Sequence, residues 1–294
     1  MPFLRFLALA GLLLLVSPAR AAPEEPVDLE LVIAVDVSWS VDAVEARLQR
    51  EGYVRAFSDS QVIEAVQSGF IGKIAVLYFE WAGMGHEKIL EDWTIIKDAA
   101  DAKAFAAKLR NRPYESGYRT SISEAIDFAV PRFEANGFDG KRRVVDISGD
   151  GANNYGRLVT VARDEALAAG ITINGLPIVS SYVEGDRSWE PNLDLYYENC
   201  VIGGRGAFLV VANGFADFAN AVRQKLVLEI AGRTLDESAV RHAGVIPRPG
   251  YLGLTGAAPE QGFVRVQERG LERAIPPCDI GERRWMYRYG GYGN

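Results

Sequence analysis

The chain has 294 residues and a formal net charge of −7, with 39 acidic side chains against 32 lysines and arginines. An acidic chain that lacks a basic cluster argues against nucleic acid as a partner. The length suits one large domain or two small ones, and the hydrophobic fraction of 48% is ordinary for a globular protein.

Residues 1–21 have the pattern of a secretory signal peptide. One positive charge precedes an apolar run over residues 6–16 that is too short to cross a bilayer, and Ala19-Arg20-Ala21 fits the small-x-small cleavage rule. We expect cleavage after Ala21, which removes Arg5 and Arg20 and brings the net charge near −9; an uncleaved anchor is the alternative. No later segment is long and apolar enough for a membrane helix. The sequence therefore predicts an exported chain, periplasmic or extracellular, with no transmembrane segment.

Apolar runs typical of buried strands alternate with amphipathic segments typical of helices between residues 31 and 230. The predicted strands cover residues 31–36, 72–81, 88–96, 143–148, 171–177 and 207–211. The predicted helices cover residues 42–57, 98–110, 120–133, 157–169 and 215–230. This alternation predicts an α/β fold: a Rossmann-like, doubly wound and mostly parallel sheet flanked by helices.

Two local patterns refine the first half of this prediction. Asp42-x-x-Glu45 has the form of a capping box at the start of a helix, and Val44, Leu48 and Phe57 fall near one face, which indicates a helix over residues 42–57. Gly83-Met84-Gly85 predicts a hairpin-like connection between the second and third strands.

The composition changes after residue 231. Gly, Pro and Arg dominate, lysine is absent and apolar periodicity disappears. We therefore expect one domain over residues 28–231, followed by an irregular C-terminal extension over 232–294 that is partly disordered or folded against the domain.

The first predicted strand ends in Asp36, Ser38 and Ser40, three small oxygen-bearing side chains at alternate positions. In extended backbone all three point to one side, and hard cations such as Mg²⁺ prefer oxygen ligands. The alternative is that Asp36 and Ser40 only cap the next helix. In a doubly wound sheet the strand that precedes Asp150 lies beside the first strand, and Thr120 begins the helix between them. All five side chains can therefore converge on one metal site.

These residues carry a resemblance to a known superfamily. Asp36-x-Ser38-x-Ser40, Thr120 in a Tyr-Arg-Thr-Ser segment and Asp150 in a Ser-Gly-Asp-Gly segment resemble the metal-ion-dependent adhesion site of the von Willebrand factor A (VWA) superfamily. Within it the chain is similar to a bacterial exported family labelled a domain of unknown function. The resemblance covers about residues 27–230.

The resemblance implies a Mg²⁺ ion (or Mn²⁺ or Ca²⁺) held by the five residues, with one coordination position open to an Asp or Glu carboxylate of a partner protein. It implies an exported, metal-dependent binding domain that is not an enzyme. Two alternatives stay open: a metal-dependent hydrolase, and an envelope scaffold with a purely structural metal. Against catalysis, His86 and His242 have no partner at the spacing of a zinc site or catalytic triad.

Aromatic residues adjoin the predicted ligands. Trp39, Tyr118 and Tyr155 could form a partner-binding rim, although Trp39 could instead pack beneath its loop. We expect Glu80 and Trp81 to cap the end of their strand.

Two further patterns concern the rest of the chain. Gly203-Gly204-Arg205-Gly206 precedes a strand, which indicates a tight turn rather than a phosphate loop. Cys200 and Cys278, an even pair in an exported chain, are a candidate disulfide; two free thiols are the alternative.

Overall fold

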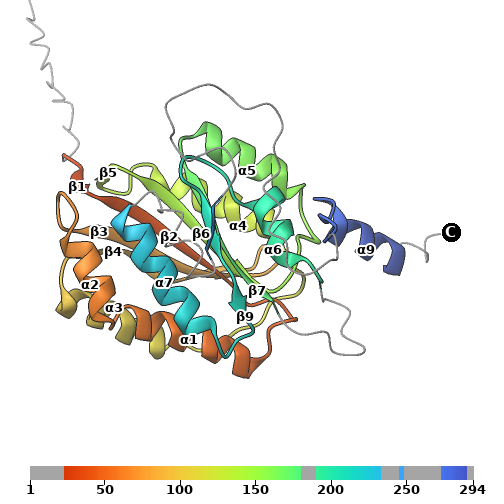
Figure 1. Cartoon of the computed structure of the whole chain (residues 1–294), viewed down its shortest axis with the longest axis horizontal. Helices are drawn as coiled ribbons and strands as arrows, with labels where there is room; N and C mark the ends of the chain where they lie inside the picture. Colours follow the sequence, from red (N-terminus) through yellow and green to blue (C-terminus); the bar gives the residue numbers. More distant parts are fainter. Residues whose placement is uncertain (1–22, 180–189, 233–244, 248–272, 290–294) are drawn as a thin grey trace, which may run out of the picture.

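The computed structural model describes residues 23–179, 190–232, 245–247 and 273–289. The predicted signal peptide and His242 lie outside the described residues. One large sheet carries the fold (Figure 1). Its strand order is β10-β8-β7-β6-β2-β3-β4, and β9 pairs with β7. Its strands are β2 (Leu29–Asp36), β3 (Ile74–Trp81), β4 (Glu87–Ile96), β6 (Arg143–Gly149), β7 (Thr172–Val179), β8 (Phe208–Val210), β9 (Ala212–Asn213) and β10 (Val245–Pro247).

The order of the strands reverses between β2 and β6, so the predicted doubly wound fold is confirmed. β2 runs parallel to both β3 and β6, and β6 runs parallel to β7. The edge strands β4 and β10 are antiparallel to their neighbours. β4 follows β3 through the predicted tight connection, in which Met84 and Gly85 have positive φ angles. All eight residues of β2 are buried, as expected of a strand covered on both faces.

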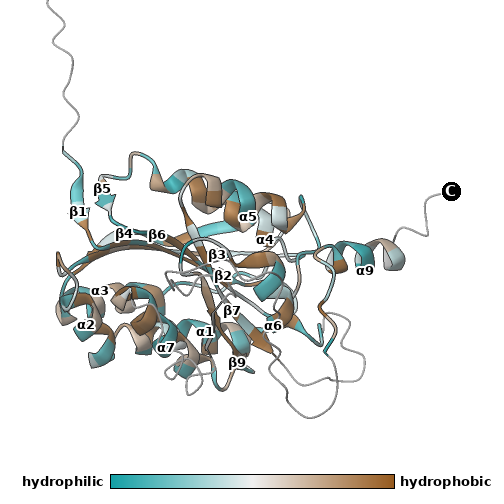
Figure 2. Cartoon of the chain, turned by 45° about the horizontal axis from the view of Figure 1, so that its top comes forward, coloured by the Kyte–Doolittle hydropathy of each residue, from teal (hydrophilic) through white to brown (hydrophobic). Residues whose placement is uncertain are grey.

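Helices cover both faces of the sheet. In Figure 2, α1, α2, α3 and α7 lie on one face, while α4 and α5 lie on the other. The helices are α1 (Ala43–Ala56), α2 (Ser60–Gln67), α3 (Ala99–Arg110), α4 (Ile122–Ala129), α5 (Val159–Ala168), α6 (Leu193–Tyr196), α7 (Phe218–Ala231) and α9 (Ile280–Tyr289). A 3₁₀ turn η1 (Val130–Phe133) extends α4, and a π-helical turn η2 (Tyr197–Val201) extends α6.

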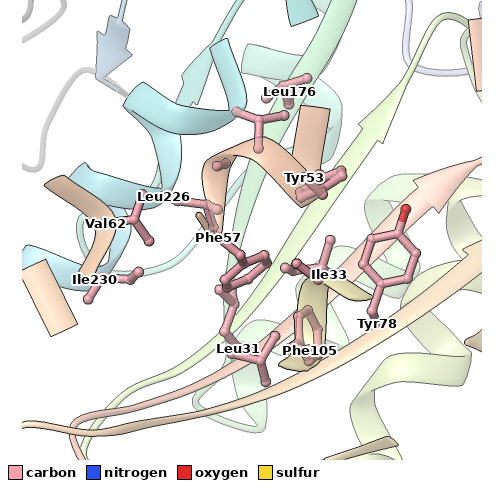
Figure 3. Close-up of a cluster of buried hydrophobic side chains, with 14 of the residues drawn as sticks. Leu31, Ile33, Tyr53, Phe57, Val62, Tyr78, Phe105, Leu176, Leu226 and Ile230 are labelled. Atoms are coloured by element: carbon pink, nitrogen blue, oxygen red, sulfur yellow. The ribbon is translucent and has the colours of Figure 1, made fainter. Parts of the chain in front are cut away.

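The alternation of side chains along β2 builds two cores. Leu31 and Ile33 face the α1, α3 and α7 side, where they meet Tyr53, Phe57 and Phe105 (Figure 3). The intervening Val32 and Ala34 belong to the cluster beneath α4 and α5. Each fully buried large apolar side chain contributes about 1.5–3 kcal/mol. The two cores fix the register of β2 and therefore the place where its last residue, Asp36, leaves the sheet.

The predicted helix α1 is confirmed, but two of its apolar positions do not lie on its buried face. Asp42 caps the helix through the predicted capping box, but Val44 and Leu48 are exposed. The buried face carries Gln49 and Arg50 beside Tyr53 instead. Polar side chains occupy this face because the fold gives them partners: Gln49 donates to the carbonyl of Asp36, and Arg50 pairs with buried Glu80.

Helix α2 and a second, smaller sheet are among the elements not predicted from the sequence. The short helix α2 follows α1 directly, and a two-stranded parallel sheet joins β1 (Glu25–Val27) to β5 (Phe138–Gly140). Buried Glu30 supports this small sheet by accepting hydrogen bonds from the Gly140 amide and the Asn136 side chain.

The described part of the C-terminal extension is folded against the domain, one of the two expected alternatives, but it is not irregular. Within its described part, residues 245–247 form β10 on the sheet edge and residues 280–289 form helix α9. Residues 280–289 carry no periodic apolar signal, because α9 contacts the domain largely through Trp285, Glu282 and Arg284. Over the described residues, no helix is long and apolar enough to cross a membrane.

Candidate metal centre

The predicted ligands lie where the carboxyl ends of β2 and β6 meet. Asp36 is the last residue of β2, and Asp150 directly follows β6. Thr120 precedes α4, whose N-cap is the neighbouring Ser121. Because Ser121 caps that helix and Asp42 caps α1, the Asp36, Ser40 and Thr120 side chains are not used as caps.

A chain of hydrogen bonds connects the five predicted ligands. The Asp36 carboxylate accepts from the Ser38 amide (2.7 Å). The Ser38 hydroxyl lies 3.0 Å from the Ser40 hydroxyl and accepts from the Thr120 hydroxyl at 3.3 Å. The Ser40 hydroxyl donates to Oδ1 of Asp150 (2.6 Å). The structure thus brings all five side chains together.

Asp36 is the electrostatic centre of this cluster. It is fully buried, and its pKa is raised well above the usual value, first by the loss of hydration and then by the charge of Asp150. Its second oxygen, Oδ2, has no hydrogen-bond partner among the described residues. A buried carboxylate oxygen without a partner is costly unless a cation or proton compensates it.

The backbone at Gly149 closes one side of the cluster. A Cβ atom on this residue would lie 2.8 Å from Oδ2 of Asp36 and 2.9 Å from the hydroxyl of Tyr197. No side chain fits there, so glycine lets the end of β6 approach the buried carboxylate closely. The next residue, Asp150, is thereby placed beside Asp36.

Thr120 is held by the loop that follows Asp150. Its amide donates to the Asn154 side-chain oxygen (3.0 Å), and its carbonyl accepts from the Asn154 amide (2.8 Å). On the other side, the loop before Thr120 is tied to the end of β2, because the Gly117 amide donates to the Val37 carbonyl. These bonds fix the position of the Thr120 backbone, which carries the hydroxyl, relative to the ends of β2 and β6.

The donor set fits a hard divalent cation. It consists of two carboxylates and three hydroxyls, all oxygen, with one unpartnered carboxylate oxygen among them. Across the described residues, no group of three or more His, Cys, Asp and Glu side chains is placed to hold a metal. A cation in this part of the chain would therefore depend on the hydroxyls of Ser38, Ser40 and Thr120 as well as on carboxylates.

The residues predicted as a rim lie beside this cluster. The Trp39 side chain is 72% exposed and makes an edge-to-face contact with Tyr118, with ring centroids 4.9 Å apart. Tyr118 is 39% exposed and Tyr155 is half-buried. The Arg119 guanidinium stands over both tyrosine rings, 5.6 Å from each centroid. Trp39 therefore does not pack beneath its loop.

Glu80 and Trp81 are buried at the end of β3, in keeping with the predicted structural role. Glu80 pairs with Arg50, which also donates to the carbonyl of Arg112 and so ties α1 to the loop leading to Thr120. His86 lies in the β3–β4 connection, where its ring adjoins Gly117.

Three residues of the site were missed by sequence reasoning. Asn153 and Asn154 organise the loop after Asp150, and their only sequence signal is an Asn pair one residue beyond the Ser-Gly-Asp-Gly segment. Tyr197 contributes a fully buried hydroxyl whose pKa is raised by burial and then by the charge of Asp36. The apolar periodicity of strands and α-helices could not identify Tyr197, because it lies in a π-helical turn.

Cys200 and Cys278 form a disulfide, with Cα atoms 5.4 Å apart. Cys200 is fully buried in η2, three residues after Tyr197. The bond attaches the segment that contains α9 to the domain.

No curated protein matches the chain. Among solved structures it is similar to proximal thread matrix protein 1 from the mussel byssus, described with a zinc-occupied MIDAS motif (16% identity, 71% of this chain and 49% of that chain, TM-score 0.47). It is also similar to BatB from Bacteroides thetaiotaomicron (20% identity, 70% of this chain and 100% of that chain, TM-score 0.43). A third similar structure is manganese-loaded Plasmodium vivax TRAP protein (15% identity, 69% of this chain and 73% of that chain, TM-score 0.45). The chain spans about half the length of the mussel protein.

One protein-family model, described as "Protein of unknown function (DUF1194)", matches residues 26–234. This range includes the whole sheet from β2 to β9 and all five predicted ligands. The chain belongs to the DUF1194 family.

Proposed function

We propose that this chain binds a divalent cation, with Mg²⁺ as the first candidate, and uses it to hold an acidic side chain of a partner protein. The ligands are Asp36, Ser38, Ser40, Thr120 and Asp150. A bound cation would supply an open coordination position for a carboxylate oxygen of the partner.

The observation that carries this proposal is the state of Asp36. Its carboxylate is fully buried, one oxygen has no hydrogen-bond partner among the described residues, and a second carboxylate, Asp150, adjoins it. Burial raises the pKa of Asp36, and repulsion by the adjacent, half-buried Asp150 raises it further. A divalent cation relieves this repulsion, whereas an apolar or anionic ligand does not.

The balance of charges supports a partner with a carboxylate. Ser38, Ser40 and Thr120 provide oxygen ligands without negative charge, so two carboxylates face the two positive charges of the ion. If all the ligands were carboxylates, the ion and its ligands together would carry a net negative charge, which repels acidic side chains. The exposed Trp39 beside the cluster adds an aromatic anchor of the kind found at the centre of protein interfaces.

The metal step is tested by titrating the purified protein with Mg²⁺ and Mn²⁺ in a calorimeter and by thermal unfolding. At 100 times the dissociation constant, an ion bound only by the folded state stabilises it by about 2.7 kcal/mol. We expect this gain in wild type and its loss in Asp150→Asn. Asp139→Asn, an exposed residue of β5 at the other end of the sheet, should keep it. Wild type without divalent binding would refute the proposal.

The partner step is tested with displayed peptide libraries selected in Mg²⁺ and eluted with EDTA. We expect selected peptides to share an Asp or Glu, and its replacement by the amide should abolish binding. Peptides that bind equally in Mg²⁺ and in EDTA would leave the ion a structural role and favour a scaffold. Metal-dependent hydrolysis of a model phosphate or ester, lost in Asp150→Asn, would favour a hydrolase instead.

A further inference from the structure

Helix α9 docks at the candidate metal centre rather than elsewhere on the domain. Both views place it at the end of the molecule where α6 lies (Figure 1, Figure 2). Its described contacts reach the loop before Thr120 and the loop after Asp150. We propose that α9 is a positioning element of the metal centre, in which Gly281 and Trp285 set the position of the Thr120 hydroxyl. This inference rests on the proposed metal site.

The first route from α9 to Thr120 passes through Arg119. The Trp285 ring lies against the Arg119 guanidinium, 2.9 Å from its central carbon to the ring centroid, and also meets Tyr118 edge to face. Arg119 has a φ angle of +71°, a left-handed conformation that is uncommon for a residue other than glycine. Such backbone persists only where the surroundings hold it. Stacking on Trp285 and the hydrogen bond from Arg119 to the Asn154 carbonyl are two such restraints.

The second route passes through Asn153. The Asn153 side chain donates to the Glu282 carboxylate (2.7 Å), and its oxygen accepts from the Ser123 amide at the start of α4. Gly281 packs so closely against this loop that a Cβ atom would collide with the Asn153 carbonyl. Glycine at position 281 is therefore required for the observed distance between α9 and the loop, although alanine is the better helix former.

Both routes end at the same residue. Asn154 follows Asn153, and its carbonyl accepts from the Arg119 side chain. Its side-chain oxygen accepts from the Thr120 amide, and its own amide donates to the Thr120 carbonyl. A displacement of α9 would thus act on Arg119 and on Asn153 at once, and Thr120 lies between them in the hydrogen-bond network.

The attachment of α9 is strong enough for such a role. The disulfide between Cys278 and Cys200 lies just before the helix, which begins at Ile280. Within the helix, Arg284 pairs with the buried carboxylate of Glu190 at 2.9 Å. Upstream, Arg273 pairs with Asp194 at 2.5 Å. The outer face, with Met286 and Tyr287 62% and 91% exposed, offers matched control positions on the same helix.

The test compares Gly281→Ala and Trp285→Ala with the controls Met286→Ala and Tyr287→Ala. The probe is Mn²⁺ alone, titrated into the oxidised full-length protein. We expect the dissociation constant to rise about tenfold in the first pair, within the range of ordinary coupling between sites, and to change less than twofold in the controls. Trp285→Phe, which retains a ring over Arg119, should recover most of the affinity. This recovery separates positioning from a general loss of stability.

A second readout does not depend on the ion. In metal-free protein, hydrogen exchange at the Thr120 and Asn154 amides should accelerate in Gly281→Ala, while exchange at the centre of β2 stays at the wild-type rate. Wild-type Mn²⁺ affinity and unchanged exchange in both Gly281→Ala and Trp285→Ala would overturn the inference and leave the proposed function intact. A wild type that binds no divalent ion would overturn both.

Discussion

The hydroxyl of Ser40 donates a 2.6 Å hydrogen bond to Oδ1 of Asp150, 110 residues further along the chain. This bond joins the chain that leaves β2 to the chain that leaves β6. A serine hydroxyl can donate to a carboxylate and can also present its lone pairs to a cation. The hydrogen bond therefore restrains both side chains before an ion binds, and the two lose less conformational freedom when they become ligands.

Divalent binding should depend on pH because Asp36 must be ionised to serve as a ligand. Burial and the charge of Asp150 raise its pKa well above 3.8 in the metal-free protein. Mg²⁺ must therefore displace a proton at acidic pH, and its affinity should increase as the pH rises through the raised pKa. Calorimetry in buffers of different ionisation heat would show proton release that decreases with pH. A Mg²⁺ affinity that stays constant from acidic to neutral pH would contradict this prediction.

The architecture and the grouping of the five ligands could be predicted because each follows from a strong local signal. Continuous apolar runs identified β2 and β6 as buried strands, and parallel strands in a doubly wound sheet bring their carboxyl ends to one place. Because Asp36, Thr120 and Asp150 have fixed places in the sequence relative to those strands, their convergence could be predicted from the sequence alone.

The remainder depends on contacts that have no period in the sequence. The buried face of α1 could not be predicted, because Gln49 and Arg50 are buried only by virtue of distant partners, the Asp36 carbonyl and Glu80. Helix α9 docks through Trp285 on Arg119 and through Glu282 on Asn153 rather than through an apolar stripe. Such pairings become visible only when the fold places both members together.

Lys225 is fully buried in α7, where its ammonium lies 2.5 Å from Asp146 and 3.0 Å from Glu229. Lys225→Met should lower the free energy of unfolding by about 3–5 kcal/mol, because two buried carboxyl groups lose their cation. Arg55→Met, which removes the cation from an exposed pair with Glu51, should lower it by less than about 1 kcal/mol. Chemical denaturation of the two variants measures the difference; equal values would contradict the buried pairing.

The same cluster gives stability a pH dependence. Burial raises the pKa of Asp146 from 3.8 to about 7 in spite of Lys225. Between these two pH values the folded state keeps a proton that the unfolded state releases. The contribution of Asp146 to the free energy of unfolding is therefore fully present below pH 3.8 and is lost as the pH rises through about 7. In the metal-free protein, Asp146→Asn should flatten this slope. The slope of wild type and variant would coincide if Asp146 did not titrate in this range.

The disulfide between Cys200 and Cys278 links residues 78 apart. In the chain-entropy model, a loop of this length stabilises the fold by about 4.5 kcal/mol. Cys278→Ser should lower the free energy of unfolding by that order and should match reduced wild type in denaturant. Thiol titration of unreduced, denatured wild type should find no free thiol, and two free thiols would rule the bond out.

Trp39 separates the two steps of the proposed function. Its side chain is exposed, so Trp39→Ala should change the stability by less than about 0.5 kcal/mol and leave Mg²⁺ affinity unaltered. Binding of a Mg²⁺-dependent peptide should weaken at least tenfold, because exposed tryptophans beside a binding centre are frequent interface hot spots. Phe70→Ala, at a position 89% exposed in the turn before β3, is the control that should bind normally. Equal peptide affinity in all three proteins would exclude Trp39 from the interface.

Gly149 and Gly151 offer a matched pair for testing the centre itself, since they flank Asp150 and differ in what a methyl group would meet. At Gly149 a Cβ atom would lie 2.8 Å from the Asp36 carboxylate, whereas at Gly151 the nearest atom, the Thr120 hydroxyl oxygen, would be 3.6 Å away. Neither residue has a positive φ angle, so alanine introduces no backbone strain at either position. Gly149→Ala must displace Asp36 or Tyr197, and we expect it to abolish Mn²⁺ binding. Gly151→Ala should bind within about threefold of wild type, because 3.6 Å is ordinary van der Waals contact. Circular dichroism and thermal unfolding of both variants establish that each is folded. Mn²⁺ binding by folded Gly149→Ala at wild-type affinity would place the cation site away from Asp36.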